Sequence, residues 1–575
     1  MIPARGGSKG LPGKNLREVA GMSLVGRAVR AARRFLAGSG ERGRVVVDTD
    51  CQAIACEGRR WGAEVPFLRA AALAADATPM IDNVLAMLER LSDDFAAVVL
   101  LQPTSPLRTA EDIAACWRVF DANARPSVLS VTAQEHAPEH TLRLEREGVG
   151  SWAWPQSAPE SRRQDLPRSM RPSGAVYVNT PAFLRKERRF FLAGVTRGVE
   201  LPRDRSIDVD TADDLLLAEL IERSRGVSPL VVGARAIGPG TPCFVIAEAG
   251  VNHGGDVAIA HRLVDAAADA HADAVKFQTF DPERLVAQTA AMADYQMRNT
   301  GRAGTQAEML RALVLPREAH AALQSHATQR GLIFLSTPFD EGSADFLESL
   351  GVPAFKMASG ELTNHPFLRH VASKGRPLLL STGMADMHEV AMALEAVESA
   401  GNPPVGLFHC VTNYPADASD ANLLAMSSMR AAFGRPVGWS DHTLGAEISL
   451  AAVAAGAVII EKHFTLDRSM AGPDHAASLS VEELASLVRG IRAVESSIGT
   501  GVKRPQPSEL PLIAAARKSL HARHDLARGQ SLLEDDLVAL RPGDGIAPSR
   551  LPLIIGRTVS RAVAAGAKLD EEDLV

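Results

Sequence analysis

Eight short apolar runs, separated by helical segments, constrain the fold of this chain more than any other feature of its sequence. From Glu248 in the first run to His463 in the last there are 215 residues over seven intervals. Each unit therefore spans about 31 residues, the size of a strand–helix repeat. The runs are FVIAEAG, DAVKFQT, LIFLSTP, AFKMASGE, LLLSTGM, VGLFHCV, VGWSDHT and VIIEKHF. Near-continuous apolar strands that alternate with helices predict an α/β fold with a (β/α)8 TIM barrel over residues 243–505.

Two further blocks flank the predicted barrel. Residues 1–225 alternate apolar strands with helical stretches and predict a separate domain, and the glycine- and proline-rich residues 226–242 predict a linker. The last block, residues 512–575, contains an internal repeat, ARGQSLLEDDLV at 527–538 and AAGAKLDEEDLV at 564–575. A domain of that size has a small core, so we expect it to dock on a barrel, its own or that of a partner.

Composition excludes several classes of protein. Sixty-two lysines and arginines against 68 aspartates and glutamates give a formal net charge of −6. This weak negative charge gives no indication of a protein that binds nucleic acid or a membrane surface. No apolar run approaches the length of a membrane span, and the first residues lack the apolar core of a signal peptide. Five scattered cysteines without a C-x-x-C pair argue against a disulfide framework or a zinc ribbon. We therefore expect a cytoplasmic multidomain enzyme.

The active site of a TIM barrel lies at the C-terminal ends of its strands. The residues at those ends are Glu248, Lys276, Gln278, Ser336, Thr337, Lys356, Ser359, Glu361, Ser381, Tyr414, Asp441, His442 and His463, with Asp474 in the following loop. Two lysines in a barrel mouth are costly unless they face an anion, so with the hydroxyls they predict a pocket for phosphate plus carboxylate. The glutamates add capacity for proton transfer. The alternative is that these carboxylates only pair with the lysines.

His442 and His463 stand at the ends of neighbouring predicted strands. A single histidine in such a place is more often a hydrogen-bonded structural residue. Two histidines that meet at the same end of adjacent strands favour a divalent metal site.

The chain begins with a second chemical motif, RGGSKGLPGKN, from Arg5 to Asn15. Its four glycines allow backbone N–H groups to approach an anion, and its three cations suit a polyphosphate. It does not match the Walker pattern, and a flexible surface loop is the alternative. Asp208 and Asp210 lie two residues apart, on one side of a predicted strand, and suit Mg²⁺ unless they form a solvated edge.

The barrel runs, together with GPDHAASL, resemble the sialic acid synthase family over residues 235–575, and LRPGDG in the last block resembles the antifreeze-like (SAF) domain of that family. The resemblance implies condensation of phosphoenolpyruvate with an N-acetylmannosamine-type sugar to give a nine-carbon 2-keto acid and phosphate. Mn²⁺ or another divalent ion on His442 and His463 would act as Lewis acid. The resemblance assigns Lys276, Lys356, Ser359, Ser381 and Ser440 to phosphoenolpyruvate, Glu248, Gln278, Tyr414 and Asp474 to the sugar, with Thr337 among the substrate-binding residues, and Glu361 to acid/base catalysis.

The same resemblance implies a homodimer in which the last domain is exchanged between subunits. Arg541 would then reach the substrate of the partner subunit, unless it is only a surface arginine beside a turn. A mass measurement that finds only monomer at micromolar concentration would contradict the dimer.

The first block is similar to the CMP-sialic acid synthetase family in the loop at Arg5, in LLQPTSPLRTAEDI at 100–113 and in RRQDLPRSMRPSGAVYV at 162–178. This resemblance implies a nucleotidyltransferase-type, Rossmann-like α/β domain in which the anomeric hydroxyl of the acid attacks the α-phosphate of CTP. Asp208 and Asp210 would hold Mg²⁺. The residues that would bind CTP are Arg5, Ser8, Lys9, Lys14 and Asn15, with Gln102 at the sugar and Arg163 or Gln164 nearby.

We therefore predict a bifunctional enzyme that makes a nonulosonic acid and activates it as its CMP derivative. GPDH followed by Ser478 and Leu479 favours the neuraminate and legionaminate branches over the pseudaminate branch, and legionaminate is the alternative product. Only Met1 and Ile2 precede the first loop where the family has a longer strand, and residues 69–76 and Ser173 depart from its pattern. Either the true start lies upstream, or the first domain is weakened or is a non-catalytic module. A barrel that acts on a pentose or tetrose phosphate is a third possibility.

Overall fold

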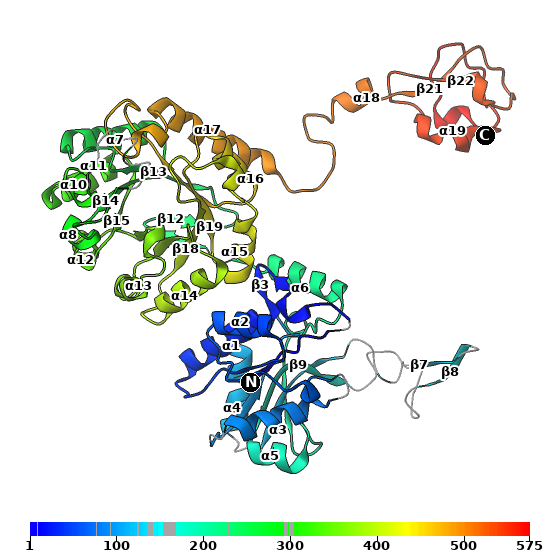
Figure 1. The fold of residues 1–575 in the computed structure, drawn as a ribbon. Coiled ribbons are helices and arrows are strands. Elements are labelled where there is room, and N and C mark those ends of the chain that lie inside the picture. Colours follow the sequence, from blue (N-terminus) through cyan, green and yellow to red (C-terminus); the bar gives the residue numbers. More distant parts are fainter. Residues whose placement is uncertain are drawn as a thin grey trace. The chain divides into compact units, whose positions relative to one another are not determined.

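The computed structural model of the chain describes residues 1–8, 10–75, 78–91, 94–122, 126–134, 138, 142–145, 148–152, 168–227, 229–292, 297 and 304–575. It forms two compact units, Met1–Ser497 and Ile498–Val575. The first unit contains a sheet covered by helices, followed along the chain by a barrel (Figure 1). No helix in the described ranges is long and apolar enough to cross a membrane.

The first domain is built on a mixed sheet. Four strands follow the order β10–β6–β9–β5, namely Arg197–Glu200, Ser127–Ala133, Met170–Asn179 and Val98–Leu100. β1 (Ile2–Pro3) pairs in parallel with β4 (Val47–Asp48), and Leu101 N donates to Met1 O at 3.0 Å, which connects β1 to the end of β5. The glycine-rich loop follows β1 directly, so it lies at the carboxyl end of these parallel strands.

The remaining elements of this domain surround the sheet. The helices are α1 (Leu24–Ser39), α2 (Gln52–Arg60), α3 (Met80–Leu91), α4 (Ala110–Ala122), α5 (Pro181–Glu187) and α6 (Ala212–Ser224). Two short antiparallel pairs complete it, β2 (Glu18–Val19) with β3 (Met22–Ser23), and β7 (Leu142–Glu145) with β8 (Gly148–Trp152).

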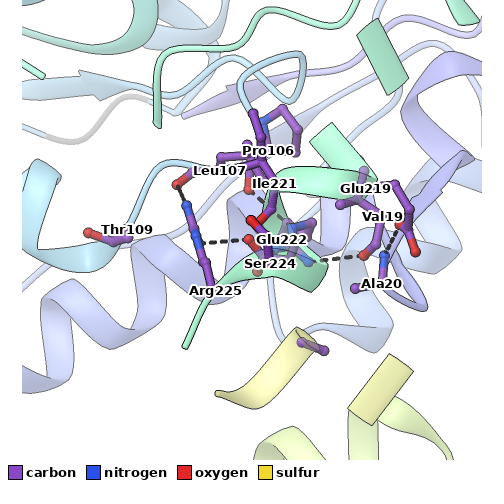
Figure 2. Close-up of polar contacts among 12 residues, drawn as sticks. Val19, Ala20, Pro106, Leu107, Thr109, Glu219, Ile221, Glu222, Ser224 and Arg225 are labelled. Atoms are coloured by element: carbon purple, nitrogen blue, oxygen red, sulfur yellow. Dashed lines mark hydrogen bonds and ion pairs between the residues drawn. The ribbon is translucent and has the colours of Figure 1, made fainter. Parts of the chain in front are cut away.

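Polar contacts fix the end of α6, where the chain leaves this domain (Figure 2). Arg225 lies 2.7 Å from Glu222 through Nη1 and Oε2, and it donates to Leu107 O at 3.3 Å. One turn earlier, Glu219 accepts a hydrogen bond from Ala20 N at 2.5 Å. These contacts connect α6 to two loops that are distant in sequence.

The barrel has the eight parallel strands that the apolar runs predict. They are β13 (Phe244–Gly250), β14 (Ala274–Thr279), β15 (Ile333–Pro338), β16 (Phe355–Met357), β17 (Leu378–Ser381), β18 (Val405–Cys410), β19 (Val437–Asp441) and β20 (Ile459–His463). Hydrogen bonds connect them in the order β15–β14–β13–β20–β19–β18–β17–β16, and β15 and β16 contact each other to close the ring. The predicted TIM barrel is confirmed.

Helices cover the outside of the barrel. They are α7 (Val257–Asp269), α8 (Pro282–Leu285), α10 (Gln306–Arg311), α11 (Arg317–Gln329), α12 (Glu341–Leu350), α13 (His365–Ala372), α14 (Met387–Glu398), α15 (Ala425–Phe433), α16 (Glu447–Ala454) and α17 (Val481–Ile498). α7 begins because Asp256 accepts hydrogen bonds from Ala258 N and Ile259 N, and it buries Leu263 against the strands.

Residues 226–242, which we predicted to be a linker, contain a β-hairpin. β11 (Leu230–Val232) pairs antiparallel with β12 (Arg235–Ile237). Leu230, Val232 and Ile237 are buried in the same apolar cluster as Phe244 at the start of β13. The sequence pattern did not indicate this hairpin, because it is stabilised by packing against the end of the barrel.

The second unit contains α18 (Leu512–Ala516), β21 (Ser519–Ala522), β22 (Leu537–Leu540) and α19 (Leu551–Ile554). β21 and β22 are antiparallel. Both copies of the internal repeat contain the same turn, in which buried Asp536 accepts a hydrogen bond from Leu533 N and buried Asp573 accepts one from Asp570 N. The sequence repeat is therefore also a structural repeat.

Candidate active sites

A cavity of about 300 Å³ opens among the C-terminal ends of the barrel strands. Twelve of the predicted residues line it, namely Glu248, Lys276, Gln278, Thr337, Lys356, Ser359, Ser381, Tyr414, Ser440, His442, His463 and Asp474. Side chains from all eight strands, or from the loops that follow them, thus meet in one cavity, as expected for the active site of a TIM barrel.

Lys276 lies at the floor of this cavity. Its Nζ is 2.8 Å from Glu248 Oε2 and donates to Thr337 Oγ1 at 3.0 Å. Gln278 Nε2 donates to the other oxygen of Glu248 at 3.3 Å. Gly250 has φ of 53°, and a Cβ there would lie 3.3 Å from Glu248 Oε1, so glycine leaves room for this carboxylate.

Lys356 forms the second half of the cluster. Its Nζ is 3.2 Å from Glu461 Oε1 and donates to Ser381 Oγ at 2.8 Å. Glu461 also accepts from Ser440 Oγ at 3.0 Å and lies 3.7 Å from Lys276 Nζ. The sequence analysis missed Glu461, although it stands two residues before His463 and so shares the inward face of β20.

The two carboxylates differ in protonation. Burial raises the pKa of Glu248 to about 7, against the attraction of Lys276. Burial also opposes ionisation of Glu461, but the neighbouring ammonium groups of Lys276 and Lys356 hold its pKa at about 2. Burial lowers the pKa of Lys356, whereas Glu248 and Glu461 outweigh burial at Lys276 and raise its pKa. Glu461 is thus a fixed anion, and Glu248 can gain or lose a proton near neutral pH.

The imidazoles of His442 and His463 face each other with ring centroids 5.7 Å apart. His442 Nδ1 is 2.6 Å from Val411 O, so Nδ1 donates and Nε2 is the nitrogen with a lone pair. His463 Nδ1 is buried and has no hydrogen-bond partner in the described part of the chain, with Asp474 Oδ2 3.9 Å away. Burial lowers the pKa of both histidines, to about 4 for His442, which keeps them neutral.

Neutral imidazoles with free nitrogens suit a divalent cation. The described residues contain no group of three or more histidine, cysteine, aspartate or glutamate side chains placed to hold a metal. In the barrel, His442 and His463 are the residues that could hold such an ion.

One wall of the barrel cavity is apolar. It consists of Val251, Phe280, Leu285, Val286, Met309, Leu310, Leu313 and Phe339. Among the described lining residues, the cationic side chains are the two lysines at the floor, each paired with a glutamate. This wall is suited to methyl groups of a substrate rather than to a second phosphate.

Four predicted residues are not in the lining of the barrel cavity, and two of them, Ser336 and Asp441, are buried at strand ends. Glu361 ends a 3₁₀ turn, Ser359–Glu361, and its Oε2 accepts a hydrogen bond from Asn364 Nδ2 at 2.8 Å. Arg541 belongs to the second unit, where it is exposed before Pro542.

A second cavity, of about 260 Å³, lies in the first domain beside the glycine-rich loop. Its lining includes the predicted residues Arg5, Ser8, Lys14, Asn15 and Gln102. Asn15 Nδ2 donates to Arg5 O at 2.9 Å and thereby holds the loop closed on itself. Lys9, Arg163 and Gln164 lie outside the described residues.

The predicted acidic pair lies close to this cavity. Asp208 Oδ1 is buried without a hydrogen-bond partner among the residues described, and burial raises the pKa of Asp208. Asp210 Oδ1 is 2.9 Å from Lys14 Nζ, which connects the pair to the loop. Gly174 has φ of 78°, and a Cβ there would lie 2.8 Å from Gln102 Oε1, so only glycine permits this close approach.

The lining also contains polar residues that sequence reasoning missed, Arg69, Thr78 and Asn83. Arg69 is buried and lies 2.7 Å from Asp48 Oδ2, at the end of β4. The only indication of Arg69 in the sequence was that a single arginine stands in an otherwise apolar segment. The chain brings it to the loop through the parallel pairing of β1 with β4.

A third hollow, of about 250 Å³, is rich in arginine and contains none of the predicted site residues. Its Glu222 is paired with both Arg27 and Arg225. Each nitrogen of the Arg27 guanidinium is engaged, since Arg27 also donates to Pro106 O and Val19 O. Arg27 and Arg225 are thus paired within the hollow, whereas Nε and Nη2 of Arg108 in the same lining have no hydrogen-bond partner among the described residues.

Three family profiles match the chain in the predicted order. The profile described as cytidylyltransferase matches residues 1–144, the profile described as NeuB family matches residues 263–503, and the SAF domain profile matches residues 517–575. The predicted recognition of a synthase, a cytidylyltransferase and an SAF domain is confirmed.

Three relatives each align with more than half of the chain. N,N'-diacetyllegionaminic acid synthase of Legionella pneumophila is 47% identical over 348 residues, which are 60% of this chain and 98% of that protein. The enzyme of the same name from Campylobacter jejuni is 44% identical over 55% of this chain and 96% of its own length. N-acetylneuraminate-9-phosphate synthase of Mus musculus is 36% identical over 56% of this chain and 90% of its own length.

Among solved structures, the N-acetylneuraminic acid synthetase of Leptospira borgpetersenii in complex with citrate has 34% sequence identity and a TM-score of 0.45. The match covers 50% of this chain and 96% of that one. On the sequence matches, the chain belongs to the NeuB family of synthases, with a cytidylyltransferase domain before the barrel and an SAF domain after it.

Proposed function

We propose that the chain catalyses two consecutive reactions. The barrel condenses phosphoenolpyruvate with an N-acetylated aldehyde sugar to give a nonulosonic acid and phosphate. The first domain then transfers CMP from CTP to the anomeric hydroxyl of that acid and releases pyrophosphate. The product of the first reaction is the substrate of the second, so each assignment supports the other.

The observation that carries the first reaction is the pair of buried lysines with their hydroxyl partners. Lys276 with Thr337, and Lys356 with Ser381, present two cations and two hydroxyls to one small cavity. Phosphoenolpyruvate carries a phosphate and a carboxylate close together, which this arrangement matches. Ser359 and Ser440 add two further hydroxyls to the lining.

The fit of the histidine pair extends the proposal to Mn²⁺ or a similar ion. His442 through Nε2 and His463 would hold it, because both imidazoles are neutral and His463 Nδ1 is without a partner among the described residues. A bound divalent ion would supply Lewis acidity at the aldehyde oxygen of the sugar. Tyr414 packs its ring 4.2 Å from that of His442 and limits how far this imidazole can rotate.

Glu248 is the residue placed to move a proton. Its pKa of about 7 leaves it partly protonated near neutrality, and a bound anion beside Lys276 would favour the neutral acid further. When C3 of phosphoenolpyruvate bonds to the aldehyde carbon, the aldehyde oxygen becomes a hydroxyl and needs one proton, which Glu248 donates in this proposal. Water then adds to C2 and returns one proton to the Glu248 carboxylate. The C2–O bond to phosphate breaks as the ketone forms, and the second proton of the water leaves with phosphate. Glu361, predicted for this role, lies outside the cavity.

The apolar wall favours a 2,4-diacetamido-2,4,6-trideoxy sugar, the precursor of a legionaminic acid. Such a sugar carries one C6 methyl and two acetamido methyl groups, which Phe280, Leu313 and Phe339 can contact. The names of the Legionella and Campylobacter relatives support this choice. N-acetylmannosamine, with a hydroxyl at C6, is the second candidate.

For the second reaction, Arg5, Ser8, Lys14 and Asn15 would hold the triphosphate of CTP, and Gln102 the acid. Asp208, whose Oδ1 is buried without a partner in the described ranges, fits a cation together with the more exposed Asp210. Mg²⁺ there would neutralise charge on the transferred phosphoryl group. We also retain the exchanged dimer, in which Arg541 contacts substrate in the partner subunit, as part of the proposal.

Mass spectrometry of a single reaction tests the proposal. The reaction holds the whole chain, Mn²⁺, Mg²⁺, phosphoenolpyruvate and CTP, with N-acetylmannosamine and its 2,4-diacetamido-2,4,6-trideoxy relative in competition. We expect a CMP-linked nine-carbon acid whose mass corresponds to the diacetamido sugar. A free acid without CMP would leave the barrel assignment intact and contradict the second activity. Absence of any nine-carbon product contradicts the proposal as a whole.

Changing Asp208 to asparagine is expected to lower CMP transfer about 10²-fold, because one carboxylate of the proposed Mg²⁺ site is lost. The assay supplies preformed nonulosonic acid and CTP and varies MgCl₂, and the Mg²⁺ requirement should rise. Asp213→Asn, at an exposed position in the first turn of α6, is the matched control and should leave transfer unchanged. Equal effects of the two substitutions would contradict the assignment.

A further inference from the structure

Directly behind the two histidines lies a buried ion pair that the proposed reaction does not use. Lys462 Nζ is 2.9 Å from Asp441 Oδ2, and the side chains are 1% and 0% exposed. Glu461 and His463 line the cavity, as do Ser440 and His442. Since side chains alternate along a strand, Lys462 and Asp441 point to the opposite side, toward the helices.

Hydrogen bonds to this pair come from two further segments, the loop that contains Thr443 and α16. Asp441 Oδ1 accepts from Thr443 N at 2.9 Å and from Thr443 Oγ1 at 2.7 Å. Asp441 Oδ2 accepts from Ser449 Oγ of α16 at 2.6 Å. Lys462 also donates to Thr443 O. The network therefore connects β19, the loop that follows His442, α16 and β20.

The ion pair lies where the pairing register of β19 and β20 determines which side chains face the cavity. Asp441 is aligned with Lys462 in the ladder between β19 and β20, so the next residues along the two strands are His442 and His463. A slip of one residue would exchange the inward and outward faces and remove one imidazole from the cavity. An ion pair across this rung penalises such a slip, because it would leave a buried charge without its partner.

Stability alone does not explain why Lys462 and Asp441, which are buried between the strands and the helices, are charged residues. A buried ion pair usually stabilises a fold no better than a well-packed apolar pair of similar volume, and it is better justified where it fixes one arrangement over others. On α16, Ala452 and Val453 are buried beside Ser449, and the carboxylates of Glu447 and Glu483 are near enough to act on the charge of Lys462.

We propose that Lys462 and Asp441 are positioning residues, which hold His442 and His463 at the separation that a divalent metal needs. This inference rests on the proposed metal site in the barrel. It assigns a role to residues that touch neither the metal nor the substrates. Outer groups that orient metal-binding histidines typically change metal affinity about 10- to 100-fold when they are removed.

The test measures Mn²⁺ binding to the whole chain without substrates, from the electron paramagnetic resonance signal of free Mn²⁺. His442→Ala identifies which Mn²⁺ ions belong to the barrel, because the first domain can also bind divalent ions. The variant is the double substitution Lys462→Met/Asp441→Leu, which keeps volume and leaves no unpaired charge. The control is Arg27→Met/Glu222→Leu, which removes another buried ion pair far from the histidines in sequence and also releases the partly exposed Arg225 from Glu222. Thermal unfolding in EDTA monitors folding of every variant.

We expect the double variant to unfold cooperatively and to bind barrel Mn²⁺ about 10- to 100-fold more weakly, while the control binds as the wild type does. A folded double variant with wild-type affinity would overturn the positioning role and leave the metal site intact. Identical Mn²⁺ binding by the wild type and His442→Ala would instead overturn the metal site itself, and the inference with it.

If the double variant does not fold, Ser449→Ala provides a second test of the positioning role. It removes one hydrogen bond from Asp441 and preserves both charges. Weaker Mn²⁺ binding by this variant, at an unchanged unfolding temperature in EDTA, supports positioning. Unchanged binding overturns it.

Discussion

Replacing Lys356 by methionine is expected to lower kcat/KM of the synthase reaction about 10³-fold, since the ammonium group would no longer stabilise negative charge on phosphoenolpyruvate. Methionine keeps most of the volume, so packing against Phe408, whose ring lies 4.9 Å from Lys356 Nζ, should be preserved. The loss should appear in the formation of nonulosonic acid. CMP transfer to a supplied acid should not change, because the first domain has its own cavity.

A stability measurement must accompany this variant. Without Lys356, Glu461 retains Lys276 at 3.7 Å and the hydrogen bond from Ser440, and breaking a buried ion pair typically costs about 3–5 kcal/mol. Lys374→Met is the matched control, because Lys374 is a mostly buried lysine of the barrel that pairs with Glu348 at 2.8 Å outside the cavity. Loss of activity in a variant that stays folded, with full activity in the control, is the expected pattern. A Lys356→Met rate within tenfold of wild type would contradict the assignment.

Much of the barrel site could be predicted because a periodic pattern and a geometric rule apply together. The spacing of the apolar runs predicted the strands, and the chain positions of the strand ends then identified the cavity lining. Glu361 is not among the residues that line the cavity. It follows the fourth run, but the 3₁₀ turn from Ser359 carries it out of the lining. Such a turn depends on local backbone geometry, which the pattern of apolar residues does not encode.

Other features arise from tertiary contacts that no sequence window contains. The hairpin at 226–242 was missed because its strands are three residues long and are held by the barrel core. Lys14 and Asp210 approach to 2.9 Å although 196 residues separate them. Glu461 was missed for a different reason. Its position two residues before His463 puts it on the same face of the strand, but the sequence analysis considered only the histidine at the end of that run.

The second large effect is expected for Glu248→Gln, which should lower kcat of the synthase reaction about 10²- to 10⁴-fold, the range for loss of a general acid. Glutamine is nearly isosteric and can still accept a hydrogen bond from Gln278, so substrate binding should change less than kcat. Because a raised pKa means that the protonated form persists to higher pH, the wild-type kcat/KM should be highest below pH 7. It should fall as the pH rises through about 7, where Glu248 loses its proton.

In Glu248→Gln that decline should disappear, because glutamine does not titrate. Glu361→Gln is the decisive comparison, since the carboxyl group of Glu361 is also perturbed by burial, which raises its pKa, but it lies outside the cavity lining. If Glu361→Gln removes the decline and Glu248→Gln keeps it, the proton comes from Glu361, and the region around its 3₁₀ turn must rearrange when substrates bind. If Glu248→Gln alone removes the decline, the free structure already holds the acid in place. Proton transfer would then depend on the same Lys276–Glu248 contact that places a cation beside phosphoenolpyruvate.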